Sequence, residues 1–212
     1  MRPFALVVFD LDGTLVDCRP DMLAAMNQVR SQVGLRPLAL QEFTPLIGAG
    51  ALELARASLS DATQGQFEEL FAVYLKTYRE RCTQKTTLYT GVREFFAAGH
   101  ACLYALLTNK RRETTERILD HFGLTGEFAC IVADGDLPVR KPDPVALQTI
   151  LTRLNKGPTD TLVVGDHHTD VEVAQRLGAT SAFIQEGIGS LADREADYSF
   201  PTFLAFSRWF ST

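Results

Sequence analysis

Two aspartates follow the first apolar run of the chain, in the sequence Asp10-Leu11-Asp12-Gly13-Thr14. On a continuing β-strand, side chains two residues apart point the same way, and Gly13 lets the chain turn directly after them. In such a pair, one carboxylate can attack phosphorus as a nucleophile while the other handles the proton of the leaving group. The spacing therefore favours a catalytic role for Asp10 and Asp12.

Two more aspartates follow a later apolar run. Asp166 comes directly after residues 161–165, and Asp170 lies four positions farther along. Carboxylates gathered at neighbouring strand ends repel one another unless a hard cation lies among them, and oxygen-only ligation indicates Mg²⁺ rather than zinc. The sequence therefore predicts a magnesium site that includes Asp10, Asp166 and Asp170.

Groups that suit a phosphate lie between these acidic segments. Lys141 would add a positive charge beside a phosphoryl group, which must be approached by an anionic carboxylate. The Thr108 hydroxyl and the backbone N–H groups of the next residues, placed at a helix start, would form a phosphate cradle. Thr108 and Asn109 have a second interpretation as helix N-cap residues, and Asp170 has one in the first turn of its helix.

Short apolar runs alternating with helical patterns would position these groups. This alternation is typical of a parallel sheet covered by helices on both faces, in which ligands bind at the carboxyl ends of the strands. The third predicted helix has a candidate capping box formed by Thr169 and Glu172. The expected strands are 4–9, 102–108, 129–133, 161–165 and 181–184, and the expected helices of this part are 111–122, 144–155, 169–178 and 202–210.

The long segment between the first two strands contains helical patterns and no convincing strand. Helices are expected near 21–33, 51–59 and 64–81, and a helical insertion explains them better than a long loop. The aromatic stripe of 64–81 favours a core role over a ligand site. We therefore predict an α/β fold, a three-layer Rossmann-like core with an inserted α-helical cap. Its predicted domains are a core of residues 1–16 and 88–212 and a cap of residues 17–87.

The composition and charge of the chain disfavour some cellular locations and some classes of partner. The formal net charge of −5 disfavours non-specific binding to nucleic acid or to an acidic membrane. No apolar stretch approaches the roughly 20 residues that span a bilayer, and the start of the chain lacks the pattern of a signal peptide. The four cysteines are widely spaced, which indicates buried thiols rather than disulfides or a zinc site. We expect a cytoplasmic protein, a monomer or a homodimer.

The segment from Phe9 to Asp17 resembles the first signature of the haloacid dehalogenase superfamily, and the other three signatures follow in order. The resemblance implies that Asp10 forms an aspartyl-phosphate and that Asp12 acts as general acid and then as general base. It implies magnesium held by Asp10, the carbonyl of Asp12 and Asp166, with Asp170 supporting the metal through water. It also implies that Thr108, Asn109 and Lys141 bind the phosphoryl group. The presence of Asp12 favours a phosphatase over a dehalogenase, because a dehalogenase has no leaving oxygen to protonate.

Within this superfamily the chain is most similar to the phosphoglycolate phosphatase group, in the segments 108–110, 141–144 and 46–50. That similarity implies a small phosphorylated metabolite as substrate, with 2-phosphoglycolate first. A pyrophosphatase, a nucleotide phosphatase, a β-phosphoglucomutase-like enzyme and a phospho-accepting signalling domain remain as alternatives. His167 departs from the pattern, since these relatives usually carry a small hydroxyl residue there, and the segment 91–102 is a few residues short. Arg56 is expected to be an ordinary exposed helical residue, although a contact with a substrate carboxylate is the alternative.

Overall fold

The protein is described by a computed structural model that covers residues 4–60 and 64–212. One six-stranded sheet forms its centre, in the order β5-β4-β1-β6-β7-β8, and every neighbouring pair of strands is parallel. The strands of this sheet are β1 (Leu6–Phe9), β4 (Leu103–Arg111), β5 (Cys130–Asp134), β6 (Thr161–Gly165), β7 (Thr180–Ile184) and β8 (Tyr198–Phe200).

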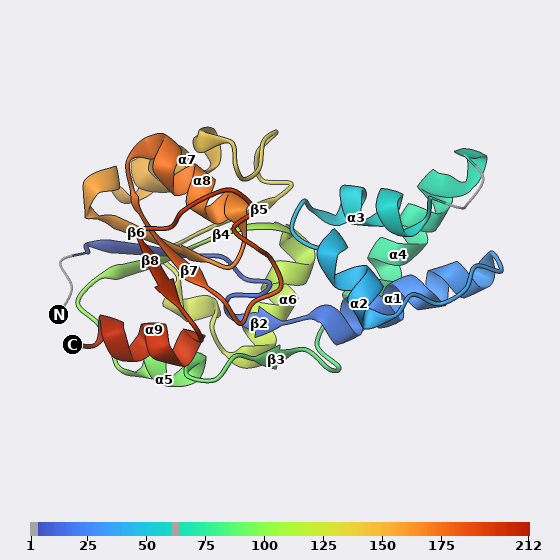
Figure 1. The fold of residues 1–212 in the computed structure, drawn as a ribbon, viewed down its shortest axis with the longest axis horizontal. Helices are drawn as coiled ribbons and strands as arrows, with labels where there is room; N and C mark the ends of the chain where they lie inside the picture. Colours follow the sequence, from blue (N-terminus) through green and yellow to red (C-terminus); the bar gives the residue numbers. More distant parts are fainter. Residues whose placement is uncertain (1–3, 61–63) are drawn as a thin grey trace.

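Helices cover both faces of the sheet, so the predicted α/β fold with a three-layer core is confirmed. Successive residues of β1 enter different apolar clusters: Val7 and Phe9 pack with one, and Leu6 and Val8 with the other. This alternation arises because successive side chains of a strand point to opposite faces. Figure 1 shows α7 and α8 on one side of the sheet, and α5 and α9 on the other. The helices of the core are α5 (Val92–Ala97), α6 (Arg112–Phe122), α7 (Pro144–Leu154), α8 (His168–Leu177) and α9 (Phe203–Phe210).

The face beneath α5 and α9 is built mainly from aromatic rings. Phe95 is 1% exposed, and its ring centroid lies 5.4 or 5.5 Å from those of Phe9, Phe96 and Phe206. Edge-to-face and tilted ring contacts of this kind add to the stabilisation from buried apolar area. The predicted C-terminal helix is confirmed as α9, and α5 is short, as the segment 91–102 suggested.

All helices between β1 and β4, apart from α5, form a separate group beside the sheet, called the cap here (Figure 1). A two-stranded antiparallel ribbon of β2 (Val16–Asp17) and β3 (Thr87–Leu88) connects this group to the core. Leu54 and Tyr74 of the cap belong to the same buried cluster as Phe9 of the sheet, so the cap is packed against the core. The helices of the cap are α1 (Arg19–Gln32), α2 (Leu40–Phe43), α3 (Ala51–Ser58) and α4 (Phe67–Arg81), with 3₁₀ turns η1 (Thr44–Leu46) and η2 (Gln64–Gln66); η3 (Thr125–Glu127) and η4 (Pro158–Asp160) lie in the core.

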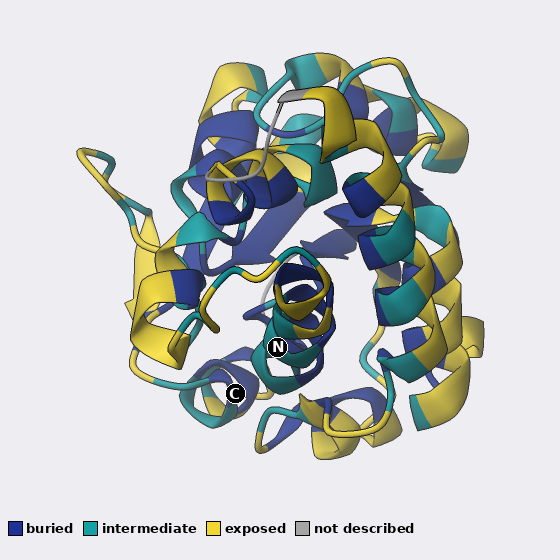
Figure 2. Cartoon of the chain, turned by 90° about the vertical axis from the view of Figure 1, so that its right-hand side faces the viewer, coloured by how far each residue is buried: buried dark blue, intermediate teal, exposed yellow. Residues whose placement is uncertain are grey.

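Figure 2 views the molecule from the side of the cap and shows buried strands in the interior, with exposed residues on the outer faces of the helices. Within the described residues, no helix has the length and apolar character needed to cross a membrane. The four cysteines are free thiols, three of them buried and Cys102 half-buried, which agrees with the prediction from their spacing.

One predicted strand end was wrong, and one strand of the sheet was missed. Strand β4 continues to Arg111, so Thr108 and Asn109 lie on a strand and are not N-cap residues at a helix start. The polar residues 108–110 suggested a strand end, but tertiary contacts bury their side chains and the strand continues. The sixth strand, β8, was not predicted either, because it has only three residues at the edge of the sheet.

Candidate active site

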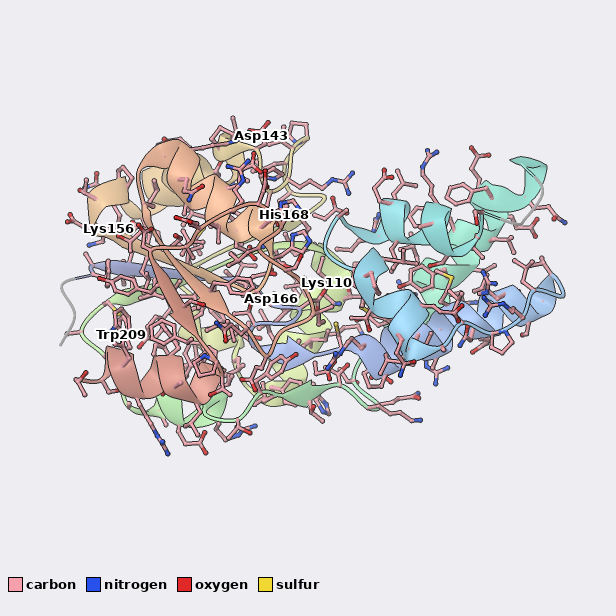
Figure 3. All side chains as sticks on the ribbon, in the orientation of Figure 1. Lys110, Asp143, Lys156, Asp166, His168 and Trp209 are labelled. Carbon is pink, nitrogen blue, oxygen red and sulfur yellow. The ribbon has the colours of Figure 1, made fainter. Side chains whose placement is uncertain are left out.

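Three neighbouring strands carry the candidate residues to one edge of the sheet. Asp10 follows β1, Thr108 lies near the end of β4, and Asp166 follows β6. Since β4, β1 and β6 are adjacent and parallel, their carboxyl ends meet. Figure 3 shows the labelled Lys110 and Asp166 at the end of the sheet that faces the cap.

Asp10, Asp166 and Asp170 form one acidic cluster. Each offers a carboxylate oxygen, these oxygens lie within 4.8 Å of one another, and all three residues are buried. Asp166 is held firmly: its Oδ2 accepts hydrogen bonds from the backbone N–H groups of Ile188 (2.7 Å) and Gly189 (2.8 Å). The other oxygen of Asp166, Oδ1, accepts the hydroxyl of Thr14 at 3.1 Å.

Two glycines allow the backbone to approach this cluster. A Cβ at Gly13 would lie 2.0 Å from Oδ2 of Asp166, and the φ of Gly13 is +88°, which side chains disfavour. A Cβ at Gly165 would lie 2.1 Å from Cγ of Asp170. Any larger residue at either position would displace an acid of the cluster.

Lys141 is the cation of this cluster. Its Nζ lies 2.8 Å from Oδ1 of Asp10 and 2.6 Å from Oδ1 of Asp170. Burial alone would lower the pKa of Lys141, but Asp10 and Asp170 outweigh it and raise the pKa, so the ammonium stays charged. Asn109 fixes the backbone here, since its Oδ1 accepts the N–H of Lys141 (3.0 Å) and its Nδ2 donates to the carbonyl of Lys141 (3.1 Å).

The charges of the cluster do not balance. Three carboxylates face one ammonium, which leaves the cluster with a net charge of −2 when all of these groups are ionised. Burial, followed by the repulsion from Asp10 and Asp170, raises the pKa of Asp166, and burial also raises that of Asp170. Oδ1 of Asp10 meets Lys141 as an ion pair but accepts no hydrogen bond from the described residues. Open carboxylate oxygens with this excess charge fit a hard divalent cation such as Mg²⁺.

Asp12 lies outside the acidic cluster. It forms an ion pair with Lys110, for which the sequence predicted no role. The Nζ of Lys110 donates to both oxygens of Asp12, each at 2.9 Å. It also donates to the hydroxyl of Tyr78, in α4 of the cap, at 2.6 Å. A lysine buried this deeply needs a charged partner. Nothing in the sequence indicated this burial, because residues 108–110 appeared to lie at a strand end.

A cavity of about 70 Å³ lies between the cap and the edge of the sheet. It is large enough to hold several water molecules or a small ligand, since one water needs roughly 10–15 Å³ of such space. In the aromatic stripe of α4, Tyr74 and Tyr78 are buried as predicted, whereas Phe67 and Phe71 are half-buried. Tyr74 and Tyr78 also line this cavity, which corrects the expectation of a purely structural role. The core supplies polar groups to the lining and the cap supplies a mainly apolar wall; among these residues are Asp10, Asp12, Thr108, Lys141, Ile47 and Leu54.

The loop before α3 connects the cap to the active site. Nδ2 of Asn109 donates to the carbonyl of Gly48 (3.1 Å), and Nη1 of Arg140 donates to the carbonyl of Ala49 (3.2 Å). A Cβ at Gly48 would lie 2.8 Å from the ring of His167. The side-chain amide of Asn109 is therefore already engaged by the backbone of Gly48 and Lys141.

His167 begins α8. The predicted capping box of Thr169 and Glu172 was wrong: the N-cap is His167, and Oδ2 of Asp170 accepts the N–H of His167 at 3.0 Å. Histidine is not a usual cap residue, which is why the sequence pattern suggested a later start. Burial, with a contribution from His168, lowers the pKa of His167 to about 4, so its ring is neutral at pH 7.

Arg56 lies on the exposed side of α3, with its guanidinium carbon 5.4 Å from the ring centroid of Phe67. It is not among the residues that line the cavity. The interpretation of Arg56 as an ordinary exposed helical residue therefore agrees with the structure.

Comparison with known proteins decides the family. Residues 7–184 match the family described as Haloacid dehalogenase-like hydrolase. The chain belongs to this family. It is 30% identical to a phosphoglycolate phosphatase of Chromobacterium violaceum over 204 residues, which are 93% of this chain and 92% of that protein. It is 33% identical to a phosphoglycolate phosphatase of Pseudomonas putida over 82% of this chain and 66% of that protein.

A crystal structure agrees with these relatives. That of a predicted phosphoglycolate phosphatase from Haemophilus somnus superimposes with a TM-score of 0.94 at 26% identity and covers 99% of both chains. The resemblance drawn from the motifs is therefore confirmed, and with it the prediction that this chain is an enzyme of the phosphatase type.

Proposed function

We propose that this enzyme hydrolyses a small phosphomonoester, with 2-phosphoglycolate first, through an aspartyl-phosphate on Asp10. The observation that carries the proposal is the cluster of Asp10, Asp166 and Asp170 within 4.8 Å, bridged by Lys141 and placed beneath a small cavity. The names of the relatives support 2-phosphoglycolate as the substrate. The size of the cavity supports a small one.

Each candidate residue has a separate role in the proposed hydrolysis. An oxygen of Asp10 attacks phosphorus, and Asp12 gives a proton to the leaving oxygen as the bond between phosphorus and that oxygen breaks. Asp12 then takes a proton from the water that attacks the aspartyl-phosphate, which releases phosphate and restores both aspartates. Lys141, the Thr108 hydroxyl and the backbone N–H of Asn109 bind the phosphoryl oxygens.

Mg²⁺ is the proposed cofactor, held by Asp10, the carbonyl of Asp12 and Asp166, with Asp170 supporting it through water. When bound, it would supply positive charge against the phosphoryl oxygens. Lys141 already lies against Asp10 and Asp170, so it would share that neutralisation. The excess negative charge of the acidic cluster is the structural support for this cofactor.

The domain boundaries, the cellular location and the oligomeric state are proposed as the sequence predicts them. The core is proposed as residues 1–16 and 88–212 and the cap as residues 17–87, with residues 1–3 outside the described part of the chain. This division is supported by the helices α1 to α4, which lie between β2 and β3. A cytoplasmic location and a monomeric or homodimeric state stay predictions. The packed cap would exclude bulk water from the site while the aspartyl-phosphate forms.

The direct test measures phosphate release from a panel that contains 2-phosphoglycolate, pyrophosphate, nucleoside monophosphates and β-glucose 1-phosphate, with Mg²⁺ and with EDTA. We expect 2-phosphoglycolate to be hydrolysed fastest, and Asp10→Asn to lower the rate at least about a thousandfold. The exposed Asp160, changed to Asn, is the matched control and should keep the native rate.

Two results would contradict this proposal. If Asp10→Asn kept the native turnover, Asp10 would not be the nucleophile. If the native protein became stably phosphorylated without releasing phosphate, the phospho-accepting signalling domain would be the better description.

A further inference from the structure

Lys110 is a buried cation with no part in the reaction proposed above. Only 4% of its side chain is exposed, and β4 carries it to the edge of the sheet beside the cavity. Both oxygens of Asp12 lie 2.9 Å from its Nζ. Burial disfavours the charged form of Lys110, but Asp12 outweighs this effect and keeps its pKa above the ordinary value. A charged ammonium is not a nucleophile, so its contacts indicate its role.

The second partner of Lys110 comes from the cap. The Nζ donates to the hydroxyl of Tyr78 at 2.6 Å and lies 4.6 Å from the centroid of the same ring. Tyr78 is itself 5% exposed and stacks on Tyr74, one turn earlier in α4, at 6.0 Å between ring centroids. The Lys110 side chain is therefore held between Asp12 of the core and a buried, stacked pair of tyrosines in the cap.

We propose that Lys110, held by Tyr78, is the positioning residue that orients Asp12 for its proton transfers. This inference rests on the proposed function, in which Asp12 is the general acid and base. Residues of the core and the cap meet in one chain of contacts, from Asp12 through Lys110 to Tyr78. The carboxyl group of Asp12 is thereby oriented only while α4 is packed against the core.

The contacts of Lys110 leave Asp12 with lone pairs that can accept a proton. Each oxygen of a carboxylate has two lone pairs, and Lys110 occupies one on each oxygen of Asp12. A second lone pair on either oxygen can hold the proton that passes to the leaving oxygen when the bond between Asp10 and phosphorus forms. The same lone pair can later accept the proton of the attacking water. Lys110 keeps its own proton throughout.

The test compares two substrates that differ in their need for a proton. The alkoxide of 2-phosphoglycolate must be protonated as it leaves, whereas the acetate of acetyl phosphate leaves as a stable anion. We expect Lys110→Met to lower kcat/KM for 2-phosphoglycolate by about a hundredfold, because the departure of its alkoxide depends on general acid catalysis. The kcat/KM for acetyl phosphate should fall by less than about tenfold, because acetate leaves without being protonated. Tyr78→Phe, which removes the hydroxyl alone, should change the ratio of the two kcat/KM values in the same direction by several-fold.

Lys76→Met is the matched control, since Lys76 lies exposed on the same helix as Tyr78, and it should leave both kcat/KM values unchanged. Thermal unfolding of each variant checks that it is folded. If Lys110→Met does not fold, Tyr78→Phe still tests the inference. Equal losses on both substrates in Lys110→Met, or an unchanged ratio in Tyr78→Phe, would overturn the inference and leave the proposed function standing. A native protein that hydrolyses neither substrate, nor any other phosphomonoester, would instead contradict the proposed function.

Discussion

Asp166→Asn should make the metal-free protein more stable while it removes activity. Asp166 is 2% exposed, and its carboxylate faces those of Asp10 and Asp170 within 4.8 Å. Asparagine keeps a carbonyl oxygen in the same place, so the N–H groups of Ile188 and Gly189 retain an acceptor. The substitution therefore removes one buried negative charge and preserves the two backbone hydrogen bonds, while the Thr14 hydroxyl must turn to accept from the new amide N–H.

The size of the gain follows from the repulsion between the carboxylates. At 4.8 Å and an effective dielectric constant of about 20, two unit charges repel each other by about 3.5 kcal/mol. Because the raised pKa values of Asp166 and Asp170 leave these groups partly protonated, and because Lys141 offsets part of the repulsion, the net gain is smaller. We expect the free energy of unfolding to rise by about 2 kcal/mol, or Tm by about 4–8 °C for a chain of this length.

Thermal unfolding followed by circular dichroism, in EDTA and in MgCl₂, measures both parts of this prediction. In EDTA the variant should unfold at the higher temperature. A ligand at a hundredfold its Kd stabilises the native state by about 2.7 kcal/mol, so saturating Mg²⁺ should raise the Tm of the native protein and leave that of Asp166→Asn nearly unchanged. The difference between the two proteins should therefore shrink or reverse in magnesium.

The exposed Asp160→Asn serves as control and should change the free energy of unfolding by less than about 0.5 kcal/mol in either buffer. A lower Tm for Asp166→Asn in EDTA would refute the reasoning, because it would mean that the Asp166 carboxylate stabilises the fold without a metal. A rise of Tm with Mg²⁺ that is equal in both proteins would show that Asp166 is not a ligand.

Two further substitutions test the contacts of the cap and the packing of the core. Gly48→Ala places a Cβ 2.8 Å from the ring of His167 at a φ of +123°, so we expect a KM several-fold higher, measured by steady-state kinetics. His167→Ala in the same chain should recover part of that loss if the steric contact is its cause. Phe95→Ala removes a ring that contacts several others, and urea denaturation should show a loss of about 3–5 kcal/mol in the free energy of unfolding.

The sequence was sufficient to predict five of the six strands of the sheet and most of the polar residues that follow them. Buried parallel strands are short apolar runs, and the positions directly after them are where polar groups gather. Asp10 and Asp166 were therefore expected to meet, although 156 positions separate them, and the structure brings their carboxylates together. The cap was also expected, because the insertion shows helical periodicity and no strand.

The sequence was not sufficient to predict the contacts made by tertiary packing. Lys110 appeared to lie at a strand end, but it is buried because Asp12 and Tyr78 surround its ammonium group. Asp12 and Lys110 are 98 positions apart, and their approach depends on β1 and β4 being neighbours. Likewise, no periodicity indicates that Gly48 of the cap reaches Asn109 of the core, since that contact depends on how the cap is oriented.

The arrangement of the lysines explains how two aspartates only two positions apart can have different roles. Lys141 is shared by Asp10 and Asp170, with Asp166 nearby, so the surroundings of Asp10 hold more negative than positive charge and favour a further cation. Asp12 instead has Lys110 as its own partner, and its carboxyl group has no such need. A cation attracted to the acidic cluster would therefore leave the side chain of Asp12 free to exchange protons. The proposed separation of the nucleophile from the acid and base would then follow from which segment supplies each lysine, β4 for Asp12 and the loop after β5 for Asp10.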